Sequence, residues 1–198
     1  MPFFKAYRWS FFCILGKGRR NNLEMKTKRK YRLFIDMDGT LAVFDTEATM
    51  EQLRAPGYFA ALSPLPNMTK TVERLLESGE FDEVYILSSY LEGTNAIEEK
   101  DSWLDHQIPQ IDTAHRIYPI CGTNKSSYIP GGVCCTDLLL DDYSVNLHDW
   151  QAAGGLGVKL LNGINGRFGT WKGAAVSNSK TPEEIAGEII AIKQCVSA

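Results

Sequence analysis

The chain has 198 residues and a net charge of −3, and its apolar and charged fractions, 44% and 23%, are ordinary for globular proteins. This composition excludes a collagen-like, wholly disordered or membrane-embedded chain. The length allows one α/β domain with a sizeable core and a small insertion, but it is too short for two ordinary catalytic domains.

Positive charge is concentrated at the N-terminus. Residues 1–32 hold ten Lys or Arg and one acidic residue, Glu24, whereas the rest of the chain holds 11 basic and 23 acidic residues. The apolar stretch at residues 11–15 is too short to cross a bilayer, and no signal-peptide cleavage pattern follows it. We therefore expect residues 1–30 to be a disordered basic extension, or to include an over-extended start upstream of Met25. The alternative is an arm that binds nucleic acid or an anionic membrane surface.

The five cysteines indicate a cytoplasmic location. Their number is odd and they show neither CxxC nor Cys/His ligand spacing, which is typical of reduced intracellular thiols. Cys134 and Cys135 adjoin an apolar run, so we expect them to behave as small buried hydrophobic residues. This interpretation disfavours a zinc or redox role for the pair.

From residue 31 onward, short apolar runs alternate with helical patterns, which is typical of βαβ units. The sequence therefore predicts one α/β domain over residues 31–198, in three layers around a parallel sheet of about five strands. The runs are apolar enough for both faces of the sheet to be covered. The expected strands are residues 33–36, 84–87, 116–120, 137–140 and 158–161.

Capping patterns indicate where two helices begin. Asn67 is placed to cap a helix after the first strand. Thr181 and Glu184 form a capping box with Pro182 at the first helical position, which predicts a C-terminal helix.

Two segments lie outside this regular pattern. Residues 44–66 are longer than a usual βα loop and contain a helical stretch near residues 46–53, which predicts a small cap. Residues 161–173 are rich in Gly and Asn, and we expect them to be mostly turns. Trp150 and Trp171 are expected to pack within the domain, with an exposed Trp171 as the alternative.

Two carboxylates follow the first expected strand. Asp36 and Asp38 fall at its carboxyl end, where open α/β sheets place their ligands, and Gly39 permits a tight turn after them. One carboxylate can attack phosphorus to form an aspartyl-phosphate, while the other protonates the leaving oxygen and then deprotonates water. Both would repel a phosphate dianion, so this chemistry requires a divalent cation and a positive side chain.

The sequence Asp36-Met37-Asp38-Gly39-Thr40 resembles the DxDGT motif of the haloacid dehalogenase (HAD) superfamily. The resemblance implies a Rossmann-like core, with Asp36 as the nucleophile, Asp38 as the acid and base, and Thr40 among the phosphate-binding residues. The superfamily's second motif is a Ser or Thr that ends the second strand. Ser88 matches it, and Ser89 follows, so we expect both to bind the phosphate.

The third motif of the superfamily is a lysine that neutralises the phosphate and the nucleophile. Lys125 is preferred because it precedes the strand that ends in the acidic pair. Lys100 is the alternative, and it could equally be a surface charge on a helix beside Glu98 and Glu99.

The fourth motif is an acidic pair, which Asp141 and Asp142 match at the end of an apolar run. Mg²⁺ prefers hard oxygen ligands, which Asp36, the backbone carbonyl of Asp38 and this pair could supply. We expect Asp142 to be the direct ligand and Asp141 to act through a water or a hydrogen bond, although the reverse assignment stays open.

Within the superfamily, residues 31–149 are most similar to the 5′(3′)-deoxyribonucleotidases and bacterial 5′-nucleotidase-like proteins, through the segments DMDGTLAVF, PGYFAALSPLPNM and EKDSWLDHQIP. The similarity implies that aromatic residues of the cap stack on a nucleobase. Candidates are Phe44, Tyr58 and Phe59, for which packing against the core is the alternative. The chain departs from the family at Tyr90, where a proline is usual, and in the longer separation of Lys125 from the acidic pair.

The resemblance implies a Mg²⁺-dependent phosphatase that acts on a small phosphorylated substrate, a nucleoside monophosphate and foremost a deoxyribonucleotide. We expect no membrane partner and no obligate nucleic-acid partner. Two alternatives are a phosphatase or phosphotransferase for a sugar phosphate or another small phosphomonoester, and a non-catalytic nucleotide- or nucleic-acid-binding module.

Overall fold

The computed structural model describes residues 30–164 and 169–197 of the chain. Its centre is a sheet of parallel strands in the order β3-β2-β1-β4-β5-β6. The described strands are β1 (Arg32–Ile35), β2 (Glu83–Leu87), β3 (Arg116–Ile117), β4 (Asp137–Asp141), β5 (Leu156–Leu161) and β6 (Ala174–Ser177). The expected N-terminal extension, apart from Lys30, lies outside the described residues.

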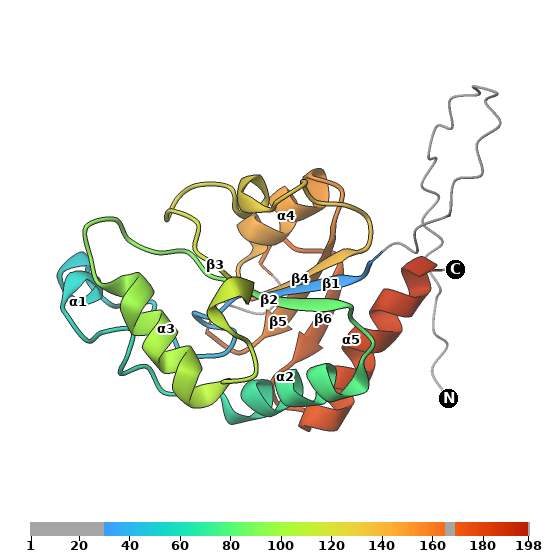
Figure 1. Ribbon diagram of the computed structural model, residues 1–198, viewed down its shortest axis with the longest axis horizontal. Coiled ribbons are helices and arrows are strands. Elements are labelled where there is room, and N and C mark those ends of the chain that lie inside the picture. Colours follow the sequence, from blue (N-terminus) through green and yellow to red (C-terminus); the bar gives the residue numbers. More distant parts are fainter. Residues whose placement is uncertain (1–29, 165–168, 198) are drawn as a thin grey trace.

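Helices cover both faces of this sheet, so the fold has three layers (Figure 1). The α-helices are α1 (Met50–Arg54), α2 (Pro66–Ser78), α3 (Ala96–Gln107), α4 (Ser144–Ala152) and α5 (Pro182–Ser197). Two 3₁₀ turns, η1 (Thr113–His115) and η2 (Lys125–Tyr128), connect the remaining elements. In the described part of the chain no helix is both long and apolar enough to cross a membrane.

Alternating side chains of the central strands divide the core into two clusters. Leu33 and Ile35 of β1 pack in the cluster that contains residues of α2, α3 and α5. Phe34 points to the other face, where Trp150 contacts it edge to face with ring centroids 5.0 Å apart. Both faces of β1 are therefore buried, as the near-continuous apolar runs of the strands predict.

The helix predictions were confirmed at α5 and wrong in detail at α2. Thr181 and Glu184 exchange the two hydrogen bonds of a capping box, and Pro182 opens α5. Asn67 is not the N-cap of α2, because Pro66 already occupies the first turn and Leu65 is the N-cap. The Asn67 amide instead donates to the backbone oxygens of Asn178 and Lys180, which ties α2 to the chain just before α5.

The structure also corrects four other expectations. The sheet has β6 as an additional strand, which follows residues expected to be turns and contains mainly small side chains. The third strand is shorter than expected and ends at Ile117. Cys134 and Cys135 are exposed rather than buried, since the turn before β4 places them outside the sheet. Trp171 is buried, so the exposed alternative for it was wrong.

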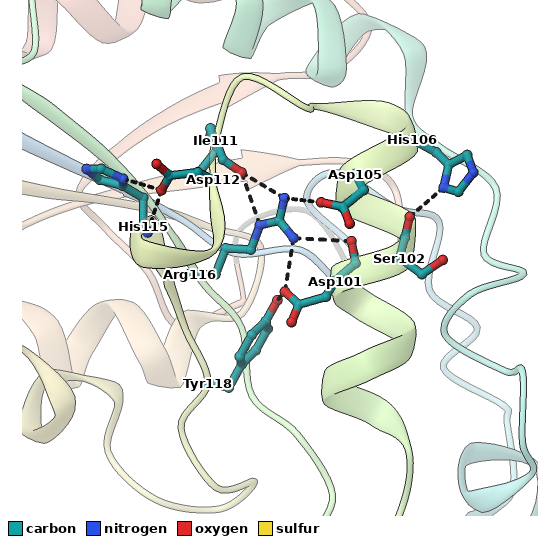
Figure 2. Close-up of polar contacts among 9 residues, drawn as sticks. All are labelled: Asp101, Ser102, Asp105, His106, Ile111, Asp112, His115, Arg116 and Tyr118. Atoms are coloured by element: carbon teal, nitrogen blue, oxygen red, sulfur yellow. Dashed lines mark hydrogen bonds and ion pairs between the residues drawn. The ribbon is translucent and has the colours of Figure 1, made fainter.

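A buried arginine joins β3 to α3 (Figure 2). The guanidinium of Arg116 donates to carboxylate oxygens of Asp101 and Asp105 at 3.1 and 2.7 Å and to the backbone oxygen of Ile111 at 2.8 Å. The hydroxyl of Tyr118 donates to the same oxygen of Asp101 at 2.6 Å. Burial and this carboxylate raise the pKa of Tyr118, which therefore remains a donor at all ordinary pH values. The network fixes α3 against the edge of the sheet.

Replacing Arg116 by Leu should lower the free energy of unfolding by about 2–3 kcal/mol, because Asp101 and the backbone oxygen of Ile111 lose their partner. Arg74→Leu is the matched control, since the Arg74 side chain is half exposed and its ion pairs lie at the surface. It should change stability much less than Arg116→Leu does. Urea unfolding measures both, and equal effects would show that the Arg116 network does not fix α3.

Candidate active site

The turn after β1 places two carboxylates at the carboxyl edge of the sheet. The amides of Leu41 and Ala42 both donate to the backbone oxygen of Met37, and Gly39 has a φ of 77°. A Cβ atom at Gly39 would lie 2.3 Å from Oδ2 of Asp142. Glycine is therefore required here twice, for its left-handed backbone and for the close approach of the acidic pair.

Asp36 and Asp141 share one buried lysine. Nζ of Lys125 lies 2.7 Å from Oδ1 of Asp36 and 2.8 Å from Oδ2 of Asp141, and all three side chains are almost fully buried. Lys125 begins η2, where the side chain of Asn124 caps the turn. The lysine predicted for the third motif therefore contacts the predicted nucleophile directly, across 89 positions of sequence.

Burial raises the pKa of Asp36 to about 8, and the charges of Asp141, Asp38 and Asp142 act in the same direction. The ammonium group of Lys125 opposes this shift. An additional positive charge near Asp36 would lower its pKa and keep the carboxylate ionised.

Asp38 and Ser88 share a different lysine. Nζ of Lys100 lies 2.5 Å from Oδ2 of Asp38 and 2.8 Å from Oγ of Ser88, and it also reaches the backbone oxygen of Ser89 at 2.7 Å. Lys100 is fully buried, so its interpretation as a helix-surface charge was wrong. The face of Phe59 covers it, with Nζ 4.7 Å from the ring centroid.

Three carboxylates form a group that could hold a cation. Asp36, Asp141 and Asp142 each present an oxygen within 4.8 Å of the others, and all three are buried. Carboxylate oxygens are the ligands that Mg²⁺ prefers, and so dense a group of buried negative charge is unfavourable without a counter-charge. The donor set therefore fits a hard divalent cation.

Two asparagine side chains hold the acidic pair in place, and the sequence analysis identified neither of them. Nδ2 of Asn146 donates to Oδ2 of Asp141, and Nδ2 of Asn162 donates to Oδ2 of Asp142, both at 2.9 Å. Asn162 also donates to the backbone oxygen of Gly39, which connects β5 to the turn after β1. No sequence motif marks either amide.

Lys159 is another residue that motif matching missed. It is buried and donates to the backbone oxygen of Asp142 at 2.9 Å and to Oγ of Ser144 at 2.8 Å. Desolvation lowers its pKa, against the effect of Asp142 and Asp141. A lysine between Val158 and Leu160 in an apolar strand was the signal that could have identified it.

A cavity of about 410 Å³ lies over Asp36 and Asp38, with Ser89 and Lys125 also in its lining. Thr40 is fully buried and does not line the cavity, and its hydroxyl has no hydrogen-bond partner among the described residues. The structure thus gathers the predicted chemical groups from the ends of β1, β2 and β4.

The structure does not bring the three predicted base-stacking residues into this lining. Phe59 is buried over Lys100, and Phe44 and Tyr58 are half-buried. The Tyr58 hydroxyl is buried without a hydrogen-bond partner in the described part of the chain. Burial raises the pKa of Tyr58, and the nearby charges of Asp45 and Asp38 raise it further. Among the described residues that line the cavity, none belongs to residues 44–66.

Comparison with known proteins gives one family match. Residues 45–170 match the family model described as "5′ nucleotidase, deoxy (pyrimidine), cytosolic type C protein". The match begins after Asp36 and Asp38, and it includes Ser88, both lysines and the acidic pair. A search of curated proteins found no match.

Solved structures show the same fold at low identity. Two are D,D-heptose 1,7-bisphosphate phosphatases, from B. bronchiseptica in complex with magnesium and phosphate (9% identity, TM-score 0.54) and from Burkholderia thailandensis (11%, 0.55). Each alignment covers 82% of this chain and 99% of the other. A third is described as a HAD-like phosphatase from Mesorhizobium loti, with 13% identity and a TM-score of 0.51 over 85% of this chain and 88% of that one.

The raised pKa of Asp36 predicts how stability depends on pH. Asp36 is protonated in the metal-free folded state up to about pH 8 but ionises near pH 4 when unfolded, so folding binds a proton between these values. This group therefore makes the folded state less stable as pH rises from about 4 to about 8. In EDTA, Asp36→Asn should have a higher Tm than wild type at pH 8. Its Tm should also fall less than that of wild type between pH 6 and pH 8.

Calorimetric melting of wild type and Asp36→Asn in EDTA tests this dependence. Adding Mg²⁺ at pH 8 should raise the wild-type Tm more than that of the variant, since the cation favours the ionised carboxylate. A pH profile that is the same in both proteins would show that Asp36 is not the titrating group.

Proposed function

Because the chain belongs to the family of cytosolic type C deoxy (pyrimidine) 5′-nucleotidases, which are HAD-type phosphatases, we propose that it hydrolyses nucleoside monophosphates with Mg²⁺. Deoxyribonucleotides are the foremost substrates in this proposal, and the reaction passes through an aspartyl-phosphate on Asp36. The observation that carries it is the unequal environment of two neighbouring carboxylates, since Asp36 is buried against Lys125 whereas Asp38 is partly exposed against Lys100.

These environments suit two different tasks. Oδ1 of Asp36 is held by Lys125 and Asp36 lines the cavity, so its carboxylate, once a cation favours the ionised form, is placed to attack phosphorus. Asp38 has one oxygen on Lys100, while its other oxygen, Oδ1, has no hydrogen-bond partner among the described residues. That oxygen can protonate the leaving group and then accept a proton from the water that hydrolyses the intermediate.

The phosphate would be held by groups around these carboxylates. Lys125 neutralises the phosphoryl oxygens, and the hydroxyls of Ser88 and Thr40 donate to them. Ser89, in the lining of the cavity, contributes a further polar contact. Lys100 orients both Asp38, the proposed acid and base, and Ser88, which would bind the phosphate.

Asp36, Asp142 and the backbone carbonyl of Asp38 would hold Mg²⁺, which supplies charge neutralisation between the nucleophile and the phosphate. Asp142 is favoured over Asp141 as the direct ligand, because Asp141 already accepts hydrogen bonds from Lys125, Asn146 and the amide of Tyr143. The cytosolic description of the family supports a cytoplasmic location.

Phosphate release from deoxynucleoside, ribonucleoside and sugar monophosphates tests the proposal. With Mg²⁺, deoxynucleoside monophosphates should give the highest kcat/KM, and EDTA should abolish turnover. Asp36→Asn should reduce kcat by more than about 10³-fold, as expected for loss of a nucleophile. Asp112→Asn makes the same change at an exposed surface residue and should leave activity intact.

The outcomes separate the alternatives. A sugar phosphate as the best substrate would favour the small-phosphomonoester phosphatase, and nucleotide binding without phosphate release would favour the binding module. Turnover in EDTA, or an unimpaired Asp36→Asn, contradicts the mechanism.

The acid role of Asp38 predicts a dependence on the leaving group. Asp38→Asn should lower kcat about 10²–10⁴-fold on a nucleoside monophosphate, whose alkoxide leaves only when protonated. The loss should be at least tenfold smaller on p-nitrophenyl phosphate, because its leaving group departs without a proton. Single-turnover kinetics that resolve formation of the phosphoenzyme make the comparison. Equal losses on both substrates would assign Asp38 a purely structural role.

A further inference from the structure

The chain between α1 and α2 passes beside α3, and two side chains of α3 hold it there (Figure 1). The carboxylate of Glu99 accepts hydrogen bonds from the backbone amides of Gly57 and Phe59, at 2.6 and 3.0 Å. One turn later on the same helix face, Nε1 of Trp103 donates to the backbone oxygen of Leu62 at 2.7 Å. Residues 57–62 are therefore anchored to α3.

The Phe59 side chain connects this segment to the reaction centre. Its ring is buried and lies over Lys100, with Nζ 4.7 Å from the ring centroid. The three N–H donors of the ammonium group have three acceptors, namely the side chains of Asp38 and Ser88 and the backbone oxygen of Ser89. Lys100 is fully buried, so solvent does not compete for these donors.

Glu99 and Lys100 are consecutive residues, so α3 holds the segment and the reacting groups from adjacent positions. Both Glu98 and Glu99 lie in the first turn of α3, where a negative charge favours the helix dipole. Glu98 is exposed, whereas Glu99 is partly buried and accepts two amides of another segment. Hydrogen bonds to a carboxylate are stronger than neutral ones. The dipole accounts equally for both residues, but only Glu99 holds the segment that carries Phe59.

We propose that Glu99 is a positioning residue for the proton transfer by Asp38. By holding the segment that keeps Phe59 on Lys100, it keeps the ammonium group on Oδ2 of Asp38 and leaves Oδ1 to exchange protons with the leaving group and with water. Glu99 thus acts through two intermediate side chains and not on the substrate. This inference rests on the proposed function and deepens it. It gives residues 57–62 a task in the chemistry that is independent of base stacking.

The first test compares two leaving groups. Glu99→Gln keeps the size of the side chain and one acceptor oxygen. It should lower kcat about five- to tenfold on a deoxynucleoside 5′-monophosphate, as expected when one hydrogen bond is lost. On p-nitrophenyl phosphate, whose leaving group needs no proton, kcat should change by less than about twofold. Glu98→Gln removes the same charge from the first turn of α3 and should change neither. An equal loss on both esters in Glu99→Gln would show that Glu99 only stabilises the fold.

The second test asks whether Glu99 and Phe59 act through one contact. Phe59→Leu removes the ring from Lys100 but keeps an apolar side chain, and it should cause the same selective loss on the nucleotide. The double variant Glu99→Gln/Phe59→Leu should lose no more than about twofold beyond the larger single loss, because both changes release the same lysine. Losses that multiply would contradict the proposed chain of contacts.

The third test does not need activity. Acetic anhydride acetylates accessible lysines, and peptide mass spectrometry compares Lys100 with Lys180, whose side chain is 42% exposed. In wild type, buried Lys100 should react at least about tenfold more slowly than Lys180. Glu99→Gln and Phe59→Leu should raise this relative rate about fivefold, and Glu98→Gln should leave it unchanged.

An unchanged relative rate of acetylation in both Glu99→Gln and Phe59→Leu overturns the inference. If wild type releases phosphate from no ester, the proposed function fails instead. The acetylation rates then still decide whether Glu99 keeps Lys100 covered.

Discussion

Two buried lysines that hold opposing carboxylates determine the architecture of this site. Asp36, Asp141 and Asp142 are buried with oxygens within 4.8 Å of one another, and burial raises the pKa of Asp36. Lys125 bridges two of them, and Lys100 holds Asp38 close by. Neither lysine is near these carboxylates in sequence. The sheet and both helical layers must therefore be formed before the charges can balance, and the site exists only in the folded chain.

This arrangement also explains why Asp36 and Asp38, two neighbouring carboxylates, differ in their burial. Asp36 ends a central strand and is enclosed by the buried group, so its environment favours the neutral form unless positive charge is added. Asp38 is two residues further along the turn, and its side chain is 20% exposed. The turn that begins at Met37 produces this difference, because Asp36 directly follows β1 whereas Asp38 already lies within the turn.

The central part of the fold could be predicted from sequence because hydrophobic runs and polar strand ends coincide there. β1, β2 and β4 are short apolar runs that stop at Asp36, Ser88 and Asp141–Asp142, and open parallel sheets bring such ends to one edge. β6 lacked such a run, and its small residues gave no strand signal. Cys134 and Cys135 were misplaced because the apolar run begins only after the turn that contains them.

Residues whose role depends on tertiary contacts were harder to predict. Lys100 has the charge of a surface residue, but it shares a helix face with the buried Ala96, Trp103 and Leu104, and that periodicity was the available signal. Lys159 was similarly marked by an apolar strand around it. For Asn146 and Asn162 the sequence offered no comparable signal, because their only distinguishing property is the carboxylate that each contacts.

The reacting residues and the other residues that line the cavity come from different parts of the fold. The carboxylates and the serine come from the three adjacent strands at the middle of the sheet, whereas most other residues that line the cavity come from the loop after the edge strand β3 and from α4 with its N-cap. Substitutions in that loop and in α4 leave the hydrogen bonds among the central strands intact. The same hydrolytic centre can consequently be combined with differently shaped entrances, which makes this scaffold suitable for engineering new substrate preferences by local changes.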